Sequence, residues 1–160
     1  MEQTLAMVKP DGVNRGLTEE CIKRILKEGL TIRETKTFTM SKELAEGFRA
    51  EIKEKHPTIW NSLIEYMTEG AMVALIVEGV SSVERVRKLC GATNPKEALK
   101  GTIRGDFGEG DMKELYKQGK VIKNIIHASG NIQEAAEELK LIFEHDAMKQ
   151  PEGDTKGGRT

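Results

Sequence analysis

The strongest candidate for covalent chemistry in this chain is His127, one of only three histidines in 160 residues. It ends a short apolar run, 121–127, and the small residues Ala-Ser-Gly separate it from a helical pattern. A helix N-terminus carries free N–H groups and partial positive charge, which favour bound anions such as phosphate. An imidazole with its ordinary pKa of about 6.5 is mostly neutral and nucleophilic at pH 7. The pattern indicates phosphate chemistry at His127; the alternative is an ordinary histidine at a strand end.

Glu138 and Ser129 are the residues that could orient this imidazole. Glu138 follows Glu134 by one turn on the same side of the predicted helix. Because helical side chains lean toward the N-terminus, Glu138 could reach back to His127, directly or through Ser129. The alternative for Glu138 is a solvated helix glutamate.

Three cations stand where they could meet a phosphate chain. Lys9 ends the first apolar run just before the turn 10–12, Arg87 lies beside the apolar stripe of a predicted helix, and Arg104 lies in a long loop. Taken singly, each is an ordinary surface cation among 25 lysines and arginines. If they converged, three cations and a magnesium ion would suit a triphosphate.

The elements that must position these residues follow from hydrophobic periodicity. Apolar runs predict strands at 4–9, 30–40, 71–79 and 121–127. Helical spacing predicts helices at 18–29, from 41 to about 54, at 58–66, at 81–90 and from 131 onward. A glycine-rich, charged loop, 91–119, precedes the last strand. Two β-α-β halves in this order predict an α+β fold, the ferredoxin-like four-stranded antiparallel sheet, with helices packed on one face.

Cap residues mark the starts of four of these helices. Thr18, Ser41, Ser81 and Asn131 are each placed as an N-cap. Ser81 and Asn131 are each followed three residues later by a glutamate, which is the pattern of a capping box.

Composition limits the remaining possibilities. The net charge is −1, which gives no general attraction to nucleic acid, and no apolar run approaches the ~20 residues of a membrane span. Cys21 and Cys90 are expected to be reduced core thiols, and the cytoplasm is the expected compartment. We expect one domain over 1–148 and a disordered tail over 149–160, which has no hydrophobic side chains.

No metal site formed by protein ligands is predicted. His56 and His145 lack partners at metal-ligand spacing, and no P-loop motif occurs. The tripeptide Asp-Phe-Gly at 106–108 matches the magnesium-binding triplet of protein kinases, but the chain is too short for that fold.

Three segments, VKPDGVNRG (8–16), GATNPKEALKGTIRGDF (91–107) and NIIHASG (124–130), resemble the hallmark segments of nucleoside diphosphate kinases. They occur in the family's order, and the likeness covers about 2–144. The resemblance implies ping-pong transfer of the γ-phosphate of a nucleoside triphosphate to a nucleoside diphosphate through a phosphohistidine. His127 would be the nucleophile, with Glu138 and Ser129 orienting it.

The same resemblance implies further residues and partners. The nucleotide's phosphates and ribose would be held by Lys9, Arg87, Thr93, Arg104 and Asn124. Mg2+ would be bound mainly through the phosphates. A homo-oligomer is expected, with a hexamer favoured, and neither a membrane nor a nucleic acid is an expected partner. Asn124 is placed at the exit of the loop, since in one strand with His127 it would face the opposite side.

The sequence departs from the family pattern in three places. Arg49 stands where a tyrosine is expected, and Gly130 removes a carboxylate near the site. The segment 108–123 is longer than in familiar members and predicts an extra helical turn. The resemblance implies that one of Thr58, Ile59 and Trp60 stacks on the base, with Ile59 preferred by count and Trp60 the aromatic candidate. The altered base-binding stretch and Gly130 motivate an alternative function, a non-catalytic nucleotide-binding regulatory module on the same fold.

Overall fold

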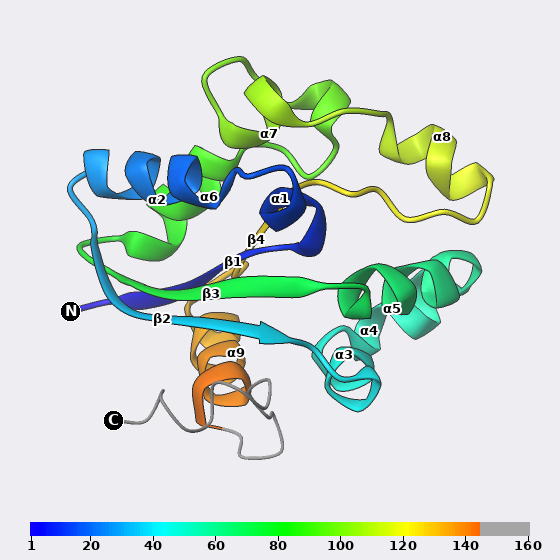
Figure 1. Ribbon diagram of the computed structural model, residues 1–160, viewed down its shortest axis with the longest axis horizontal. Helices are drawn as coiled ribbons and strands as arrows, with labels where there is room; N and C mark the ends of the chain where they lie inside the picture. Colours follow the sequence, from blue (N-terminus) through cyan, green and yellow to red (C-terminus); the bar gives the residue numbers. More distant parts are fainter. Residues whose placement is uncertain (145–160) are drawn as a thin grey trace.

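The protein is an antiparallel sheet of four strands covered by helices (Figure 1). The computed structural model describes residues 1–144, so the tail expected at 149–160 lies outside the described residues. The strands run in the order β2-β3-β1-β4. Their bounds are β1 (Gln3–Val8), β2 (Thr31–Thr39), β3 (Ala71–Glu78) and β4 (Ile126–Ala128). The predicted α+β, ferredoxin-like class is confirmed.

The helices occupy the connections between these strands. From the first connection to the end of β3 they are α1 (Pro10–Asn14), α2 (Thr18–Lys27), α3 (Lys42–Phe48), α4 (Ala50–Lys55), the 3-10 helix η1 (Pro57–Ile59) and α5 (Trp60–Thr68). After β3 they are α6 (Ser82–Cys90), the 3-10 helix η2 (Pro95–Glu97), α7 (Ile103–Phe107), α8 (Met112–Lys117) and α9 (Ile132–Glu144).

Helices cover both faces of the sheet, so the expectation of helices on one face is wrong. Figure 1 shows α2 and α6 on one side of the strands and α9 on the other. Successive side chains of β1 alternate between the two layers: Leu5 and Met7 pack with α3, α5 and α9, whereas Ala6 and Val8 pack with α2 and α6. The reason is visible in the sequence, because β1 and β3 are apolar at nearly every position and must be buried on both faces.

Two of the four predicted caps are confirmed. Ser41 Oγ accepts a hydrogen bond from Leu44 N at 3.0 Å at the start of α3. Asn131 Oδ1 accepts one from Glu134 N at 2.8 Å at the start of α9. In both cases the residue types alone determine the local contact.

The other two caps are wrong. Thr18 is the first residue of α2 and follows Leu17, so its side chain does not cap the helix. Ser81 has a left-handed backbone (φ 53°) and also makes no side-chain cap. Glu2 replaces it, because its carboxylate accepts from Val83 N at 2.8 Å. A residue that is distant in the sequence but adjacent in the fold has taken over a local capping role.

Three elements differ in extent from their predictions. The turn after Lys9 continues as α1, with Pro10 at its first position, where the missing N–H costs nothing. The helix expected from 41 to 54 is interrupted at Arg49 (φ −120°, ψ 34°) and becomes α3 and α4. The strand expected at 121–127 pairs only at 126–128, where it meets β1.

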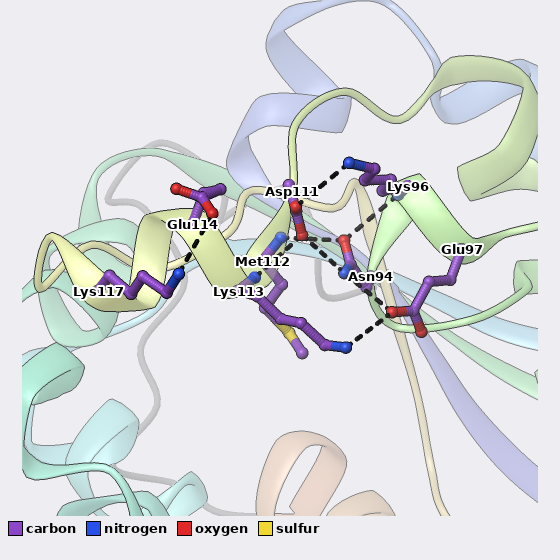
Figure 2. A network of polar contacts seen from close by, with 8 residues as sticks. All are labelled: Asn94, Lys96, Glu97, Asp111, Met112, Lys113, Glu114 and Lys117. Atoms are coloured by element: carbon purple, nitrogen blue, oxygen red, sulfur yellow. Dashed lines mark hydrogen bonds and ion pairs between the residues drawn. The ribbon is translucent and has the colours of Figure 1, made fainter.

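The long loop after α6 is ordered by a polar network, and its extra helical turn is confirmed as α8 (Figure 2). Asn94 is its centre. Its Oδ1 accepts from the backbone N–H of Lys96 and of Met112, at 3.3 and 2.9 Å. Its Nδ2 donates to Asp111 Oδ1 at 3.0 Å, and Asp111 in turn caps α8 by accepting from Lys113 N. One buried amide therefore joins η2 to α8.

Both cysteines are buried and free, as predicted. Within residues 1–144 no helix has the length and apolar character that crossing a membrane requires.

Candidate active site

His127 lies on β4 opposite Met7, and α9 orients its imidazole. Its Nε2 is 2.8 Å from Glu138 Oε1, and Ser129 Oγ donates to the same oxygen at 2.7 Å. Both predicted orienting contacts are therefore present. Since an ionised carboxylate only accepts, Nε2 carries the proton. Nδ1 makes no hydrogen bond to any residue of 1–144, so its lone pair is available.

The surroundings keep this imidazole neutral. Burial lowers the pKa of His127, the hydrogen bond with Glu138 opposes that effect, and the charges of Lys9 and Arg49 lower the pKa further. Burial also raises the pKa of Glu138, but the hydrogen bonds from His127 and Ser129 outweigh it and hold this pKa below its ordinary value. The pair at pH 7 is consequently a neutral imidazole beside a carboxylate.

Lys9 reaches the site from the end of β1, where it precedes α1. It is only 6% exposed, and its Nζ donates to Asn124 Oδ1 at 2.9 Å. Burial, followed by the charges of Arg104 and Arg49, lowers the pKa of Lys9 to about 7. An ammonium held in this way gains strongly from any anion that enters the site.

A strained loop exit delivers Asn124 to Lys9. Asn124 lies before β4, as predicted, and its Nδ2 donates to Thr93 O at 2.9 Å. The next residue, Ile125, has a left-handed backbone (φ 74°), which is unfavourable for a β-branched side chain. Its carbonyl accepts from Lys9 N at 2.7 Å. Gly12 is required there, because a Cβ on it would lie 2.9 Å from that oxygen.

Arg104 is a buried cation that organises the loop around the site. Its guanidinium donates to three backbone carbonyls: to Asn124 O at 3.2 Å, to Gly91 O at 2.8 Å, and to Ile126 O. It is 8% exposed, and burial lowers its pKa. Arg104 therefore brings positive charge to the site while fixing the backbone on both sides of Asn124 and at Gly91.

The predicted residues converge on one cleft of about 1360 Å³. Arg87, on α6, and Thr93, in the loop after it, are exposed on its wall. Seven of the eight predicted site residues line it, namely Lys9, Arg87, Thr93, Arg104, Asn124, His127 and Glu138. Ser129 is fully buried and contacts Glu138. The result is a neutral imidazole in a cleft whose wall also carries Lys9, Arg87 and Arg104.

Comparisons with known proteins identify the family. The family model described as nucleoside diphosphate kinase matches residues 2–148. The chain belongs to the nucleoside diphosphate kinase family.

Relatives match along almost the whole chain. The nucleoside diphosphate kinase of Archaeoglobus fulgidus is 44% identical over 148 residues, covering 92% of this chain and 90% of the relative. That of Pyrococcus abyssi is 45% identical over 147 residues, with 92% and 87% covered.

Solved structures give the same family. The Borrelia burgdorferi nucleoside diphosphate kinase, a transition-state mimic with bound vanadate and ADP, superposes with a TM-score of 0.84 at 38% identity, covering 96% of this chain and 95% of that one. The Halobacterium salinarum enzyme in complex with CDP gives 0.79 at 33% identity, with 98% and 97% covered.

The three base-contact candidates lie elsewhere in this nucleoside diphosphate kinase. Among the described residues that line the cleft there is no Thr58, Ile59 or Trp60. Ile59, the preferred candidate, is 1% exposed and belongs to the core, so it has no free surface for stacking. Trp60 lines a separate small pocket beside Lys42 on α3. None of the three lines the cleft that contains His127.

Two kinase residues that shape the site were not singled out from the sequence. Asp11 accepts from Ile125 N at 3.1 Å and from Tyr66 OH at 2.5 Å, so it supports the strained loop exit. The ring of Tyr66 lies 5.5 Å from Lys9 Nζ, in cation–π range. The available signal for Asp11 was its place directly after Lys9 and Pro10. No local signal pointed to Tyr66.

Proposed function

We propose that His127 is the nucleophile through which this nucleoside diphosphate kinase transfers the γ-phosphate of a nucleoside triphosphate to a nucleoside diphosphate. One observation carries the assignment: the contact of Nε2 with Glu138 at 2.8 Å leaves Nδ1 free in the same cleft as Lys9, Arg87 and Arg104. Glu138 orients the ring, and Ser129 holds Glu138.

In the first half-reaction the Nδ1 lone pair attacks the γ-phosphorus. The N–P bond forms as the bond from phosphorus to the β,γ-bridging oxygen breaks, and the nucleoside diphosphate leaves with that electron pair. Nε2 keeps its proton, and the negative charge of Glu138 stabilises the positive charge that the ring acquires. A terminal β-phosphate oxygen of a second diphosphate then attacks the phosphorus and restores free His127.

The nucleotide is bound by the other predicted residues. Lys9, Arg87, Thr93, Arg104 and Asn124 hold its phosphates and ribose in this proposal. Cations aimed at oxygens whose charge develops in the transition state are a main source of rate enhancement in phosphoryl transfer. Support comes from their common location on the cleft wall and from the Lys9–Asn124–Thr93 chain of hydrogen bonds.

Mg2+ fits this site as an ion carried by the nucleotide. Residues 1–144 contain no group of three or more His, Cys, Asp or Glu side chains that could hold a metal. Mg2+ prefers oxygen ligands and commonly binds through substrate phosphates and water. When bound, Mg2+ would neutralise phosphate charge. The protein positions Lys9 and the two arginines without the help of the ion.

The domain extent, the compartment and the oligomeric state of the enzyme are also proposed from the sequence and the resemblance. We place residues 1–148 in a single domain and expect a cytoplasmic homo-oligomer, with a hexamer favoured. The edge strand β2 supports self-association, since it is nine residues long and mostly exposed. Size-exclusion chromatography with light scattering tests the assembly by measuring its molar mass. The mass of six chains of 17.8 kDa is expected, and the mass of a single chain would contradict the proposal.

The alternative of a non-catalytic regulatory module is not favoured. The relatives are named as nucleoside diphosphate kinases, and one structural neighbour is a transition-state mimic. The departure at Gly130 leaves the His127–Glu138 contact intact, because Gly130 N donates to Glu134 at 3.1 Å, away from that pair.

Labelling with γ-radiolabelled ATP alone tests the function. The wild-type protein should retain an acid-labile, base-stable phosphate, as expected of a phosphohistidine, and should pass it to added GDP. His127→Ala should retain none. Equal labelling of both proteins, or no labelling of either, would show that the proposed nucleophile is wrong.

A further inference from the structure

Arg49 is a cation of the cleft to which no role has yet been given. It stands where α3 ends and α4 begins, and its side chain lines the cleft together with His127 and Lys9. Its Nε donates to Glu51 Oε2 at 3.2 Å. In residues 1–144 its terminal Nη1 and Nη2 groups have no hydrogen-bond partner. Two donors are therefore available beside a site that takes phosphates.

The position of Arg49 ties it to the nucleophile. The ring of the preceding residue, Phe48, contacts the imidazole of His127 edge-on, with 5.2 Å between ring centroids. The charge of Arg49 also lowers the pKa of His127, of Lys9 and of Glu138. These three groups come from different elements and meet at the centre of the site, so a single guanidinium lies close enough to act on all of them.

We propose that Arg49 is a further phosphate-binding residue, which contacts the phosphoryl group while His127 carries it. The proposal rests on the proposed function of His127. Glu51 holds the guanidinium by Nε and leaves both Nη groups for phosphoryl oxygens. An arginine can donate to two such oxygens at once, whereas a lysine presents a single ammonium.

Electrostatics make this contact more favourable after phosphoryl transfer than before it. Before transfer, Arg49 faces a neutral imidazole and disfavours its protonation, which keeps Nδ1 nucleophilic. After transfer it faces the negative oxygens of the phosphoryl group. An interaction that strengthens as the reaction proceeds stabilises the transition state and the phosphoenzyme more than the free enzyme. The resemblance places a tyrosine here, which is uncharged at pH 7, so the contribution is particular to this chain.

The test compares phosphoenzyme formation in Arg49→Ala, Arg49→Lys and the wild type, using γ-radiolabelled ATP and measured amounts of ADP. Arg49→Ala should lower the equilibrium constant for phosphoenzyme roughly ten- to hundredfold, the range of one hydrogen bond to a charged group. The equilibrium constant of Arg49→Lys should lie between those of Arg49→Ala and the wild type. Lys27→Ala removes an exposed cation at the end of α2, outside the cleft lining, and should change the constant by less than about twofold.

A pH profile separates this role from a structural one. Among the groups that face His127, Glu138 raises its pKa, whereas Lys9 and Arg49 lower it. Removing Arg49 should therefore raise that pKa and move the acidic limb of the phosphorylation rate to higher pH. Arg49→Gln keeps a long side chain without the charge, so it repeats the test should alanine disturb the α3–α4 junction.

The outcomes are distinct. An equilibrium constant and a pH limb that are both unchanged in Arg49→Ala and Arg49→Gln would overturn the role of Arg49 while leaving His127 in place. A wild-type protein that is not labelled, or a labelled His127→Ala, would instead overturn the proposed function.

Discussion

At the residue scale, the charge of Glu138 is the feature of the site that a single substitution tests best. Glu138→Gln keeps the size of the side chain and an oxygen that can accept from Nε2, but it removes the charge that stabilises the ring after attack. We expect phosphoenzyme formation to slow about 100-fold with little change in nucleotide affinity. Rapid-quench labelling at saturating ATP measures the rate.

Glu137→Gln is the matched control, since this neighbouring glutamate on α9 is exposed and pairs only with Gln133 among the described residues. It should label like the wild type. A Glu138→Gln enzyme that is phosphorylated at the wild-type rate would show that the ring needs no carboxylate.

Lys9 gives the site a pH dependence whose sign can be worked out. In the free protein its pKa is about 7, so the ammonium is charged below that pH and largely neutral above it. Bound phosphates favour the charged form, and ADP binding above pH 7 should therefore take up a proton. As the pH rises above 7, the affinity for ADP should fall by up to about tenfold for each pH unit. Calorimetry at pH 8 in two buffers of different ionisation enthalpy measures the uptake, expected to approach one proton in the wild type and to vanish in Lys9→Met.

Residue chemistry was predictable where partners are close in sequence. Glu138 and Ser129 follow His127 along one short connection and one helix, so spacing and the lean of helical side chains were enough. The partner of Lys9 was not, because Asn124 is 115 residues away and its placement depends on the strained backbone of Ile125. The burial of Lys9 and Arg104 was missed for the same reason, since the carbonyls that Arg104 binds become neighbours only in the folded chain.

At the element scale, the amide of Asn94 should control the order of the loop that carries Thr93. Asn94→Ala leaves two backbone N–H groups and the carboxylate of Asp111 without their partner, at a cost of about 1–3 kcal/mol. Because Thr93 O accepts from Asn124, the loosening should extend to the phosphate site. We expect faster amide hydrogen exchange across 93–124 and a higher KM for ATP.

The control for Asn94 lies on α8, the helix that the Asn94 network contacts. Glu114 pairs with Lys117 at 3.4 Å, and both side chains are exposed, so Glu114→Ala should change stability by no more than about 0.5 kcal/mol. If both variants exchange at the wild-type rate, the network of Figure 2 is not what orders the loop.

Helices and strands with a strong hydrophobic periodicity were predicted from the sequence. Elements whose extent depends on tertiary contacts were not. The apolar runs gave β1, β2 and β3, and Ser41 and Asn131 gave the starts of α3 and α9. The strand at 121–127 was overestimated, because only 126–128 lies where β1 offers hydrogen-bond partners. Ser81 failed as a cap because Glu2 supplies the bond instead.

At the scale of the whole molecule, the sheet separates two apolar layers. We therefore predict that substitutions in the two layers affect stability independently. Ile25 of α2 is buried in one layer, and Met67 of α5 is buried in the other. Truncating either to alanine should lower the free energy of unfolding by about 2–5 kcal/mol, through lost transfer energy and the cavity left behind. Since the two side chains belong to different clusters, the double variant should lose the sum within about 0.5 kcal/mol.

Urea unfolding of the four proteins at one fixed chain concentration measures these losses, because subunit association would otherwise shift the midpoints. Leu26→Ala serves as control, since this neighbour of Ile25 is 51% exposed and its loss should cost little. A double variant that departs from the sum by more than about 1 kcal/mol would mean that the layers communicate through the sheet. In that case the substitution of Met67 on α5 would also affect the layer on the other face of β1, which contains α6 and its cleft residue Arg87.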